Sequence, residues 1–106
     1  MVEEINIDGQ KIELKHLGFN TPVDWYQAKK KCEEFGEGWR LPTISELKLI
    51  YKELHQKENF QPAVYWSGTE SSSLRAWTLD FGYGTDDHSY YKDNKAYTLA
   101  IKSKNI

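Results

Sequence analysis

The stretch GWRLPTISEL at residues 38–47 contains the clearest helix start in the chain. Thr43 and Glu46 have the spacing of a capping box, in which each side chain accepts a hydrogen bond from a free amide of the first turn. The helix should end before the polar residues 56–59. The apolar residues that follow its start recur every three or four positions and predict one buried face: Ile44, Leu47, Ile50, Tyr51 and Leu54.

Another helix is expected just before this stretch. Thr21 can cap it, Pro22 suits its first position, and Asp24 lies near the positive end of its dipole. Gly36 and Gly38 should end it. Its apolar face has helical spacing and consists of Trp25, Ala28, Cys32 and Phe35.

The first residues predict a β-hairpin. Asp8-Gly9 is typical of a two-residue turn, and it makes residue 7 face residue 10, residue 5 face residue 12, and residue 3 face residue 14. In that register four apolar side chains share one face, as a half-buried hairpin requires: Ile5, Ile7, Ile12 and Leu14.

After residue 60 the hydrophobic period becomes two. Alternating apolar residues predict strands at 64–66, 77–81 and 97–101. Residues 82–95 are rich in Gly, Asp, Ser, Tyr and Asn without periodicity, and they are predicted to form a long loop. A hairpin, two helices and then strands indicate an α+β fold.

Composition narrows the class of protein. The 106 residues suffice for a single domain, spanning 1–106, with one core. A hydrophobic share of 39% against 28% charged residues excludes a disordered chain. The net charge of -2 predicts neither nucleic acid nor membrane as a partner. With one cysteine and no apparent signal peptide or membrane span, we expect a cytoplasmic protein without disulfides.

Several blocks of sequence occur in a recognisable order. They are DWYQAKKKCEEF at 24–35, GWRLPT followed by a helix from 38, YWSGTE at 65–70, AWTLDF at 76–81 and YTLAIK at 97–102. This order resembles the bacterial Lcl C-terminal domain-like family, a relative of the formylglycine-generating-enzyme-like branch of the C-type lectin fold. The resemblance runs from about the first helix to the end of the chain.

The resemblance implies a compact C-type-lectin-like fold. Two helices would pack on antiparallel sheets, the N- and C-terminal strands would be paired, and a second sheet would carry a loop-rich ligand face. Members of the wider group bind glycans, proteins or phage receptors. The chain lacks the Glu-Pro-Asn and Trp-Asn-Asp motifs of calcium-dependent sugar binding, the nearest string being WTLD at 77–80. It also lacks the paired cysteines of extracellular lectins, and YTLAIK at 97–102 replaces an arginine-containing string of its relatives.

Catalysis has little support in the sequence. Cys32 could pair with His16, His55 or His88 as nucleophile and base. Cys32 nevertheless shares the predicted apolar helix face, where a thiol serves as a small core residue. Copper-dependent oxidation of the formylglycine type needs two cysteines. We therefore expect no enzyme and no catalytic residues.

A metal site is the next alternative. Asp86, Asp87 and His88, joined by Asp80 or Asp93, could offer oxygen ligands to a divalent ion such as calcium. A calcium loop needs more oxygen ligands at regular spacing, so a solvated acidic loop is the simpler interpretation. We expect no cofactor and no metal ligands, with calcium as the alternative.

The combination of tyrosine and aspartate in residues 82–95 indicates a binding surface instead. Tyrosine offers rigid, amphipathic contact area at little entropic cost, although one or two of these rings could fold back over the sheet. Trp66 could border this face, but its apolar alternation favours the core. The candidate binding residues are Trp66, Asp80, Tyr83, Asp86, Asp87, His88, Tyr90 and Tyr91.

The sequence therefore predicts a non-catalytic binding module. Recognition of another protein through the acidic, tyrosine-rich loop of about 82–95 is the first hypothesis, and such a loop favours a basic partner site. A carbohydrate or small-ligand module, with or without calcium, is the alternative.

Overall fold

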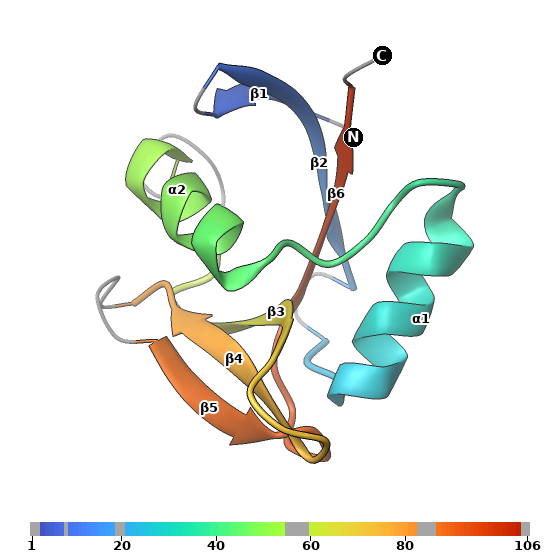
Figure 1. The fold of residues 1–106 in the computed structure, drawn as a ribbon, viewed down its shortest axis with the longest axis vertical. Helices are drawn as coiled ribbons and strands as arrows, with labels where there is room; N and C mark the ends of the chain where they lie inside the picture. The colour runs from blue at the N-terminus through green and yellow to red at the C-terminus, as the bar shows by residue number, and fades with distance from the viewer. Residues whose placement is uncertain (1–2, 8, 19–20, 55–59, 83–86, 105–106) are drawn as a thin grey trace.

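The computed structural model describes residues 3–7, 9–18, 21–54, 60–82 and 87–104, which form six strands and two helices (Figure 1). In chain order they are β1 (Glu3–Ile7), β2 (Gln10–Leu17), α1 (Trp25–Phe35), α2 (Ile44–Leu54), β3 (Val64–Glu70), β4 (Arg75–Asp80), β5 (Asp87–Tyr91) and β6 (Thr98–Ser103). The strands make two antiparallel three-stranded sheets, β1-β2-β6 and β3-β4-β5. The predicted α+β class is confirmed.

The hairpin register is also confirmed. Ile7 pairs with Gln10 and Ile5 pairs with Ile12. Gly9 has a φ of 81°, a conformation that glycine adopts without strain. On its other side β2 pairs with β6, so the N- and C-terminal strands share one sheet with β2 between them.

α2 begins as the sequence predicts. The Thr43 amide donates to Glu46 Oε1 at 2.8 Å, and the Glu46 amide donates to Thr43 Oγ1 at 3.1 Å, which is the reciprocal pair of a capping box. The helix ends at Leu54, before the polar stretch. Leu47, Ile50 and Leu54 are buried.

The expected start of α1 is wrong by several residues. Asp24, rather than Thr21, is the N-cap, and its carboxylate accepts a 2.9 Å hydrogen bond from the Gln27 amide. The helix starts later because of a contact with a residue that is distant in the sequence. Val23 exchanges two backbone hydrogen bonds with Ala96, and this pairing holds Val23 in an extended conformation. The helix ends at Gly36 as expected.

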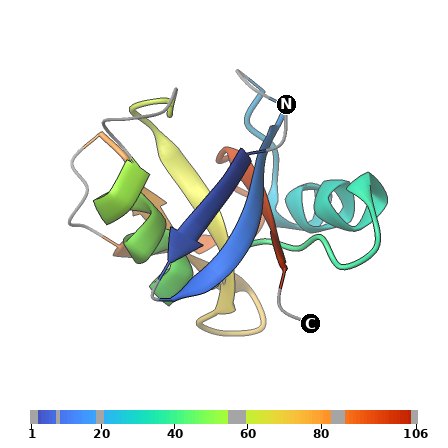
Figure 2. The same cartoon turned by 90° about the horizontal axis from the view of Figure 1, so that it is seen from above.

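Two hydrophobic cores lie on opposite sides of the central strands. Figure 2 shows α2 on one side of the first sheet and α1 on the other. Strand β6 serves both cores, since Leu99 and Ile101 point into the core under α2 and Ala100 into the core under α1. Strand β3 does the same with Tyr65 and Trp66. Each of these five residues is at most 1% exposed.

The prediction of a featureless loop at 82–95 is wrong, because this segment contains β5. Strand β5 pairs with β4 from Leu79↔Asp87 to Arg75↔Tyr91. Tyr90 and Tyr91 project to opposite faces of the strand, so no apolar alternation marks it in the sequence. Strand β3 is also longer than the predicted 64–66, since it runs to Glu70 with a register shift after Trp66.

Candidate binding surface

The second sheet brings four of the predicted site residues onto one face. Trp66 lies opposite Thr78, which lies opposite His88, and side chains alternate along each strand. Asp80 and Tyr90 therefore share the face of Trp66 and His88, whereas the side chain of Tyr91 projects from the other face. Of the remaining predicted residues, Asp87 is the first residue of β5, and residues 83 and 86 lie outside the described part of the chain.

Trp66 is a core residue and does not border an open ligand face. It is fully buried, and its indole N–H donates a 2.8 Å hydrogen bond to the Val23 carbonyl. The half-buried Tyr90 ring packs edge-on against it, with the centroids 6.1 Å apart. The binding interpretation of Trp66 is thus corrected, while His88 remains exposed.

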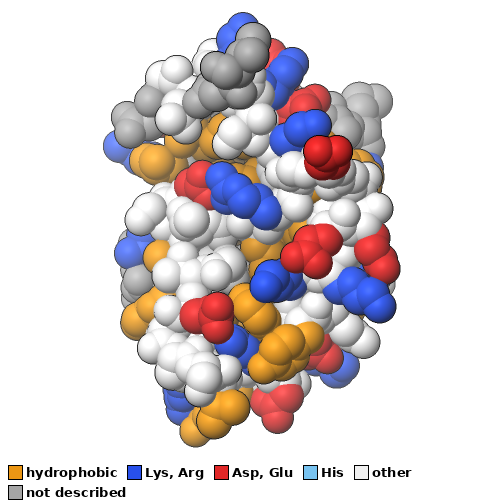
Figure 3. Space-filling view, turned by 45° about the vertical axis from the view of Figure 1, so that its right-hand side comes forward, with side chains coloured by type: hydrophobic (Ala, Val, Ile, Leu, Met, Phe, Trp, Pro, Cys, Tyr) orange, Lys and Arg blue, Asp and Glu red, His pale blue; other side chains and the backbone are white. Residues whose placement is uncertain are grey.

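Tyr91 belongs to a cluster of exposed apolar side chains. It is 50% exposed, and it borders a depression of about 230 Å³ together with Tyr26, which is 56% exposed, and Leu74, which is 65% exposed. Lys92 and Asp93 complete its lining. We call this the Tyr26–Leu74–Tyr91 surface. Figure 3 shows exposed hydrophobic side chains at the lower end of the molecule, with acidic and basic side chains among them.

The backbone of Lys92 holds the three parts of this surface together. Its amide donates a 2.9 Å hydrogen bond to the Leu74 carbonyl, in the turn between β3 and β4. Its carbonyl accepts a 2.9 Å hydrogen bond from Trp25, whose amide has no partner within α1 because it is the first residue of the helix. The start of α1, the β3–β4 turn and the end of β5 are therefore fixed relative to one another.

The side chain of Lys92 reinforces the same junction. It is only 4% exposed, and its ammonium contacts the Glu70 carboxylate at 2.5 Å and the Ser73 carbonyl at 2.9 Å. The ammonium also lies 4.4 Å from the centroid of the Trp25 ring, a cation–π distance. The hydrogen bond from Lys92 lowers the pKa of Glu70.

Arg75 orders Tyr91 from the opposite strand. Its guanidinium lies 3.9 Å from the Tyr91 ring centroid and donates a 3.1 Å hydrogen bond to the Ser89 carbonyl. The Asn94 amide donates to the Tyr91 carbonyl at 3.0 Å. Two carbonyls of the edge strand β5 thus already accept hydrogen bonds, which is one way in which sheet edges are protected.

The sequence reasoning found Tyr91 but missed Tyr26 and Leu74. A signal existed for each of them. Tyr26 falls outside the apolar stripe of α1, and Leu74 follows three consecutive serines. A large apolar residue in an otherwise polar part of the sequence is expected to be exposed. Both residues could therefore have been named as candidate binding residues.

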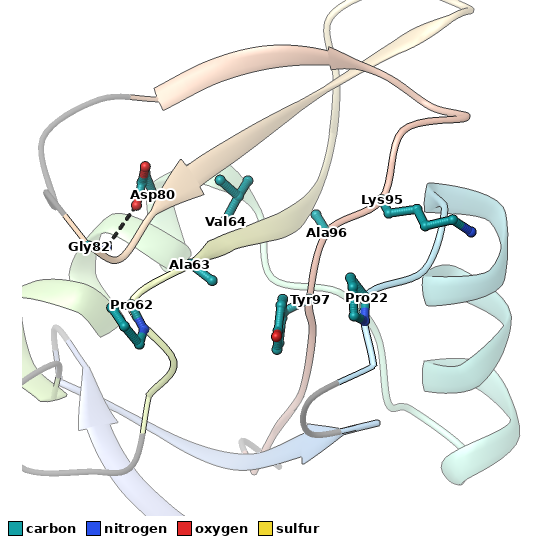
Figure 4. A pocket seen from close by; sticks show the side chains of 9 residues that line it. All are labelled: Pro22, Pro62, Ala63, Val64, Asp80, Gly82, Lys95, Ala96 and Tyr97. Carbon is teal, nitrogen blue, oxygen red and sulfur yellow. Dashed lines mark hydrogen bonds between the residues drawn. The ribbon is translucent and has the colours of Figure 1, made fainter.

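A shallower depression of about 610 Å³ lies at the other end of the second sheet (Figure 4). Asp80 and Lys95 stand at its opposite ends, with Val64 and Ala96 between them. Asp80 Oδ1 accepts a 2.7 Å hydrogen bond from the Gly82 amide, which fixes the carboxylate.

Cys32 is fully buried on α1. Burial, and secondly the charge of Glu33, raises the pKa of its thiol to about 12, so the group is protonated at neutral pH and acts in packing. Within the described ranges, no group of three or more His, Cys, Asp or Glu side chains could hold a metal ion. In those same ranges no helix is long and apolar enough to cross a membrane.

The fold and surface define a small α+β domain with an ordered, tyrosine-bearing face. Residues 7–102 match the family model of the Lcl C-terminal domain. Because this match spans most of the chain, the protein belongs to the Lcl C-terminal domain family. A comparison with curated proteins finds no match.

Proposed function

We propose that this protein is a non-catalytic binding module that recognises another protein through the Tyr26–Leu74–Tyr91 surface. One observation carries the proposal. Within the described residues four large apolar side chains are exposed, and three of them border a single depression. Clustered aromatic residues are enriched at protein interfaces, whereas single exposed ones are common everywhere.

The surface is suited to binding because it is ordered before a partner arrives. The hydrogen bonds of Lys92 and the stacking of Arg75 fix the positions of Leu74 and Tyr91. Less conformational entropy is then lost on association. Since two carbonyls of β5 already accept hydrogen bonds, contact through side chains is favoured over addition of a partner strand.

The charges around the surface favour a basic partner. Asp93 lines the surface and makes no ion pair among the described residues, whereas the ammonium of Lys92, the other charged residue of the lining, is paired with Glu70. The partner would present an apolar side chain for the depression, with lysine or arginine around it. Its association should weaken as salt concentration rises.

The test compares wild type with the triple variant Tyr26→Ser, Leu74→Ser, Tyr91→Ser. All three side chains are at least half exposed, so the fold should survive, which circular dichroism checks. Phe35→Ser is the matched control, because Phe35 is 40% exposed but packs against Trp39 instead.

Proteins captured by immobilised wild type are identified by mass spectrometry, and the purified candidate is titrated at low and high salt. We expect the triple variant to lose at least tenfold in affinity, as hot-spot residues do. The Phe35 variant should bind normally. Equal binding by the triple variant, or affinity that does not depend on salt, contradicts the proposal.

A carbohydrate or small-ligand module, with or without calcium, is the second candidate. The depression between Asp80 and Lys95 favours it, and the burial of Trp66 disfavours it because that ring cannot stack on a sugar. A glycan screen with and without calcium tests this candidate. Binding that Asp80→Asn abolishes would support it, and a blank screen at millimolar ligand would exclude it.

We further propose that the domain has the C-type-lectin-like fold of the formylglycine-generating-enzyme-like branch. Two helices, two three-stranded sheets and terminal strands in one sheet support this assignment. An experimental structure that superposes on such domains with the same strand order would test it. A cytoplasmic location, suggested by the lone buried thiol of Cys32, is tested by fractionating the source cells.

A further inference from the structure

A separate depression of about 300 Å³ lies between α1, the segment that leads into α2, and β3. It is not part of the Tyr26–Leu74–Tyr91 surface, although the Glu70–Lys92 pair lies between the two. Figure 3 shows recessed hydrophobic side chains between basic and acidic ones on the side of the molecule that α1 borders.

The floor of this depression is apolar and rigid. Trp25 and Leu41, at 4% and 5% exposure, contribute side chains to it. The Trp25 indole N–H donates a 3.0 Å hydrogen bond to the Ser67 carbonyl, which fixes the plane of the ring. Gly68 adds no side chain to the lining, and a Cβ there would reach only van der Waals contact with Leu41, at 3.4 Å.

Most of the charges around the depression neutralise one another. Arg40 makes a two-pronged ion pair with Glu46, at 2.7 and 2.9 Å, and Glu70 is paired with Lys92. Lys29 makes no ion pair among the described residues, although its charge also helps to lower the pKa of Glu70. Its ammonium lies 5.4 Å from the Trp25 ring centroid, above the floor. The depression therefore has one cation in excess.

Hydrogen-bond donors remain beside that cation. A guanidinium has five N–H groups, and Arg40 uses three of them for the Leu41 carbonyl and the two Glu46 oxygens. The Thr43 hydroxyl accepts from the Glu46 amide and keeps its own O–H for donation. Donors of Lys29, Arg40 and Thr43 thus surround an apolar floor.

We infer that this depression binds a small carboxylic acid with a compact apolar body. The carboxylate would lie among the donors of Lys29, Arg40 and Thr43, with the apolar body against Trp25 and Leu41. A carboxylate is favoured over a neutral group because it takes up the excess positive charge and accepts charge-assisted hydrogen bonds. The inference does not depend on the proposed protein partner.

The probe is 4-methylpentanoate, compared with its neutral amide of nearly the same shape. The protein is titrated while the NMR signals of the tryptophan indole N–H groups are followed, and the signal of Trp25 is assigned with Trp25→Phe. We expect a saturable shift of the Trp25 signal with the acid. Binding of the amide should be at least tenfold weaker.

Lys29→Gln should weaken binding of the acid about tenfold, the loss expected when a charge-assisted hydrogen bond is removed. Lys31→Gln is the matched control, because Lys31 is exposed on the same helix and does not line the depression. Equal binding of acid and amide, unchanged binding in the Lys29 variant, or no shift at all overturns the inference.

A tripeptide that ends in leucine distinguishes the source of the carboxylate. If it binds more tightly than the free acid, the site takes a peptide C-terminus; if more weakly, it takes a small metabolite, and both outcomes keep the carboxylate site. Lys29→Gln should leave the protein partner bound. Failure of the carboxylate site is therefore separable from failure of the protein-binding proposal.

Discussion

Lys92 joins three segments of the candidate surface through a side chain that is almost completely buried. A buried ion pair is weak evidence of stabilisation, because removing an ammonium from water offsets much of its attraction to a carboxylate. The four-carbon stem, in contrast, packs like any apolar side chain. We therefore attribute most of the contribution of Lys92 to its stem.

This attribution predicts different results for two substitutions. Lys92→Ala removes stem and charge together and should lower the free energy of unfolding by about 2–3 kcal/mol. Lys92→Met keeps a stem of similar length and should recover most of that loss. Urea unfolding measures both, with Lys95→Ala as an exposed control expected within about 0.5 kcal/mol of wild type. A Met variant as unstable as the Ala variant would assign the contribution to the charge.

At the scale of elements, the start of α2 depends on the ionisation of Glu46. Burial raises the pKa of this carboxyl, but hydrogen bonds from Arg40 and Thr43 outweigh burial and hold its pKa below the ordinary value. A lowered pKa in the folded state means that ionisation stabilises the fold. This stabilisation is complete above the unfolded-state pKa of about 4.3, and it is lost as pH falls through the lower folded-state pKa.

Glu46→Gln should therefore be destabilising at neutral pH and nearly neutral in acid. Glutamine can still cap the helix but cannot form the ion pair with Arg40. We expect a loss of about 1 kcal/mol at pH 7 that shrinks toward zero below about pH 4. Urea unfolding of both proteins across this range checks it. A difference that is independent of pH would mean that the charge of Glu46 does not matter.

Elements whose signals are local were predictable from the sequence. The capping box of α2 and the turn at Gly9 involve residues within three or four positions of each other, and both have the predicted geometry. The start of α1 and strand β5 depend on distant partners, Ala96 in one case and β4 in the other. Period and propensity carry no information about such pairing.

The residues of the candidate surface also differ in whether the sequence could predict them. Tyr91 was predictable because it lies in a tyrosine-rich segment, whereas Tyr26 and Leu74 join it only through the fold. The backbone hydrogen bonds of Lys92 to Trp25 and Leu74 span 67 and 18 positions, taken as 92 − 25 and 92 − 74. Trp66 was equally ambiguous, since alternation marks a buried residue on either face of a strand.

For the molecule as a whole, the question is whether its two cores unfold together. They share strands, because successive residues of β3 and of β6 enter different cores. Neither core can therefore lose its strands while the other keeps them, and one cooperative transition is expected. Trp25 and Trp66 both belong to the core under α1, whereas Leu47 belongs to the core under α2. Tryptophan fluorescence can thus report on the core under α1 while a substitution at Leu47 perturbs the core under α2.

Leu47→Ala should lower the free energy of unfolding by about 2–5 kcal/mol, as expected for a leucine that is 0% exposed. If the cores are one cooperative unit, tryptophan fluorescence must report the whole loss, although the substitution lies in the other core. Its urea midpoint should coincide with that of far-ultraviolet circular dichroism, which follows both helices. A fluorescence midpoint that stays at the wild-type value while the circular dichroism midpoint falls would instead show that the core under α1 is stable by itself. The core under α1 includes Trp25, on which the carboxylate site and one edge of the Tyr26–Leu74–Tyr91 surface both depend. Separate midpoints would therefore mean that both sites remain folded after the core under α2 has unfolded.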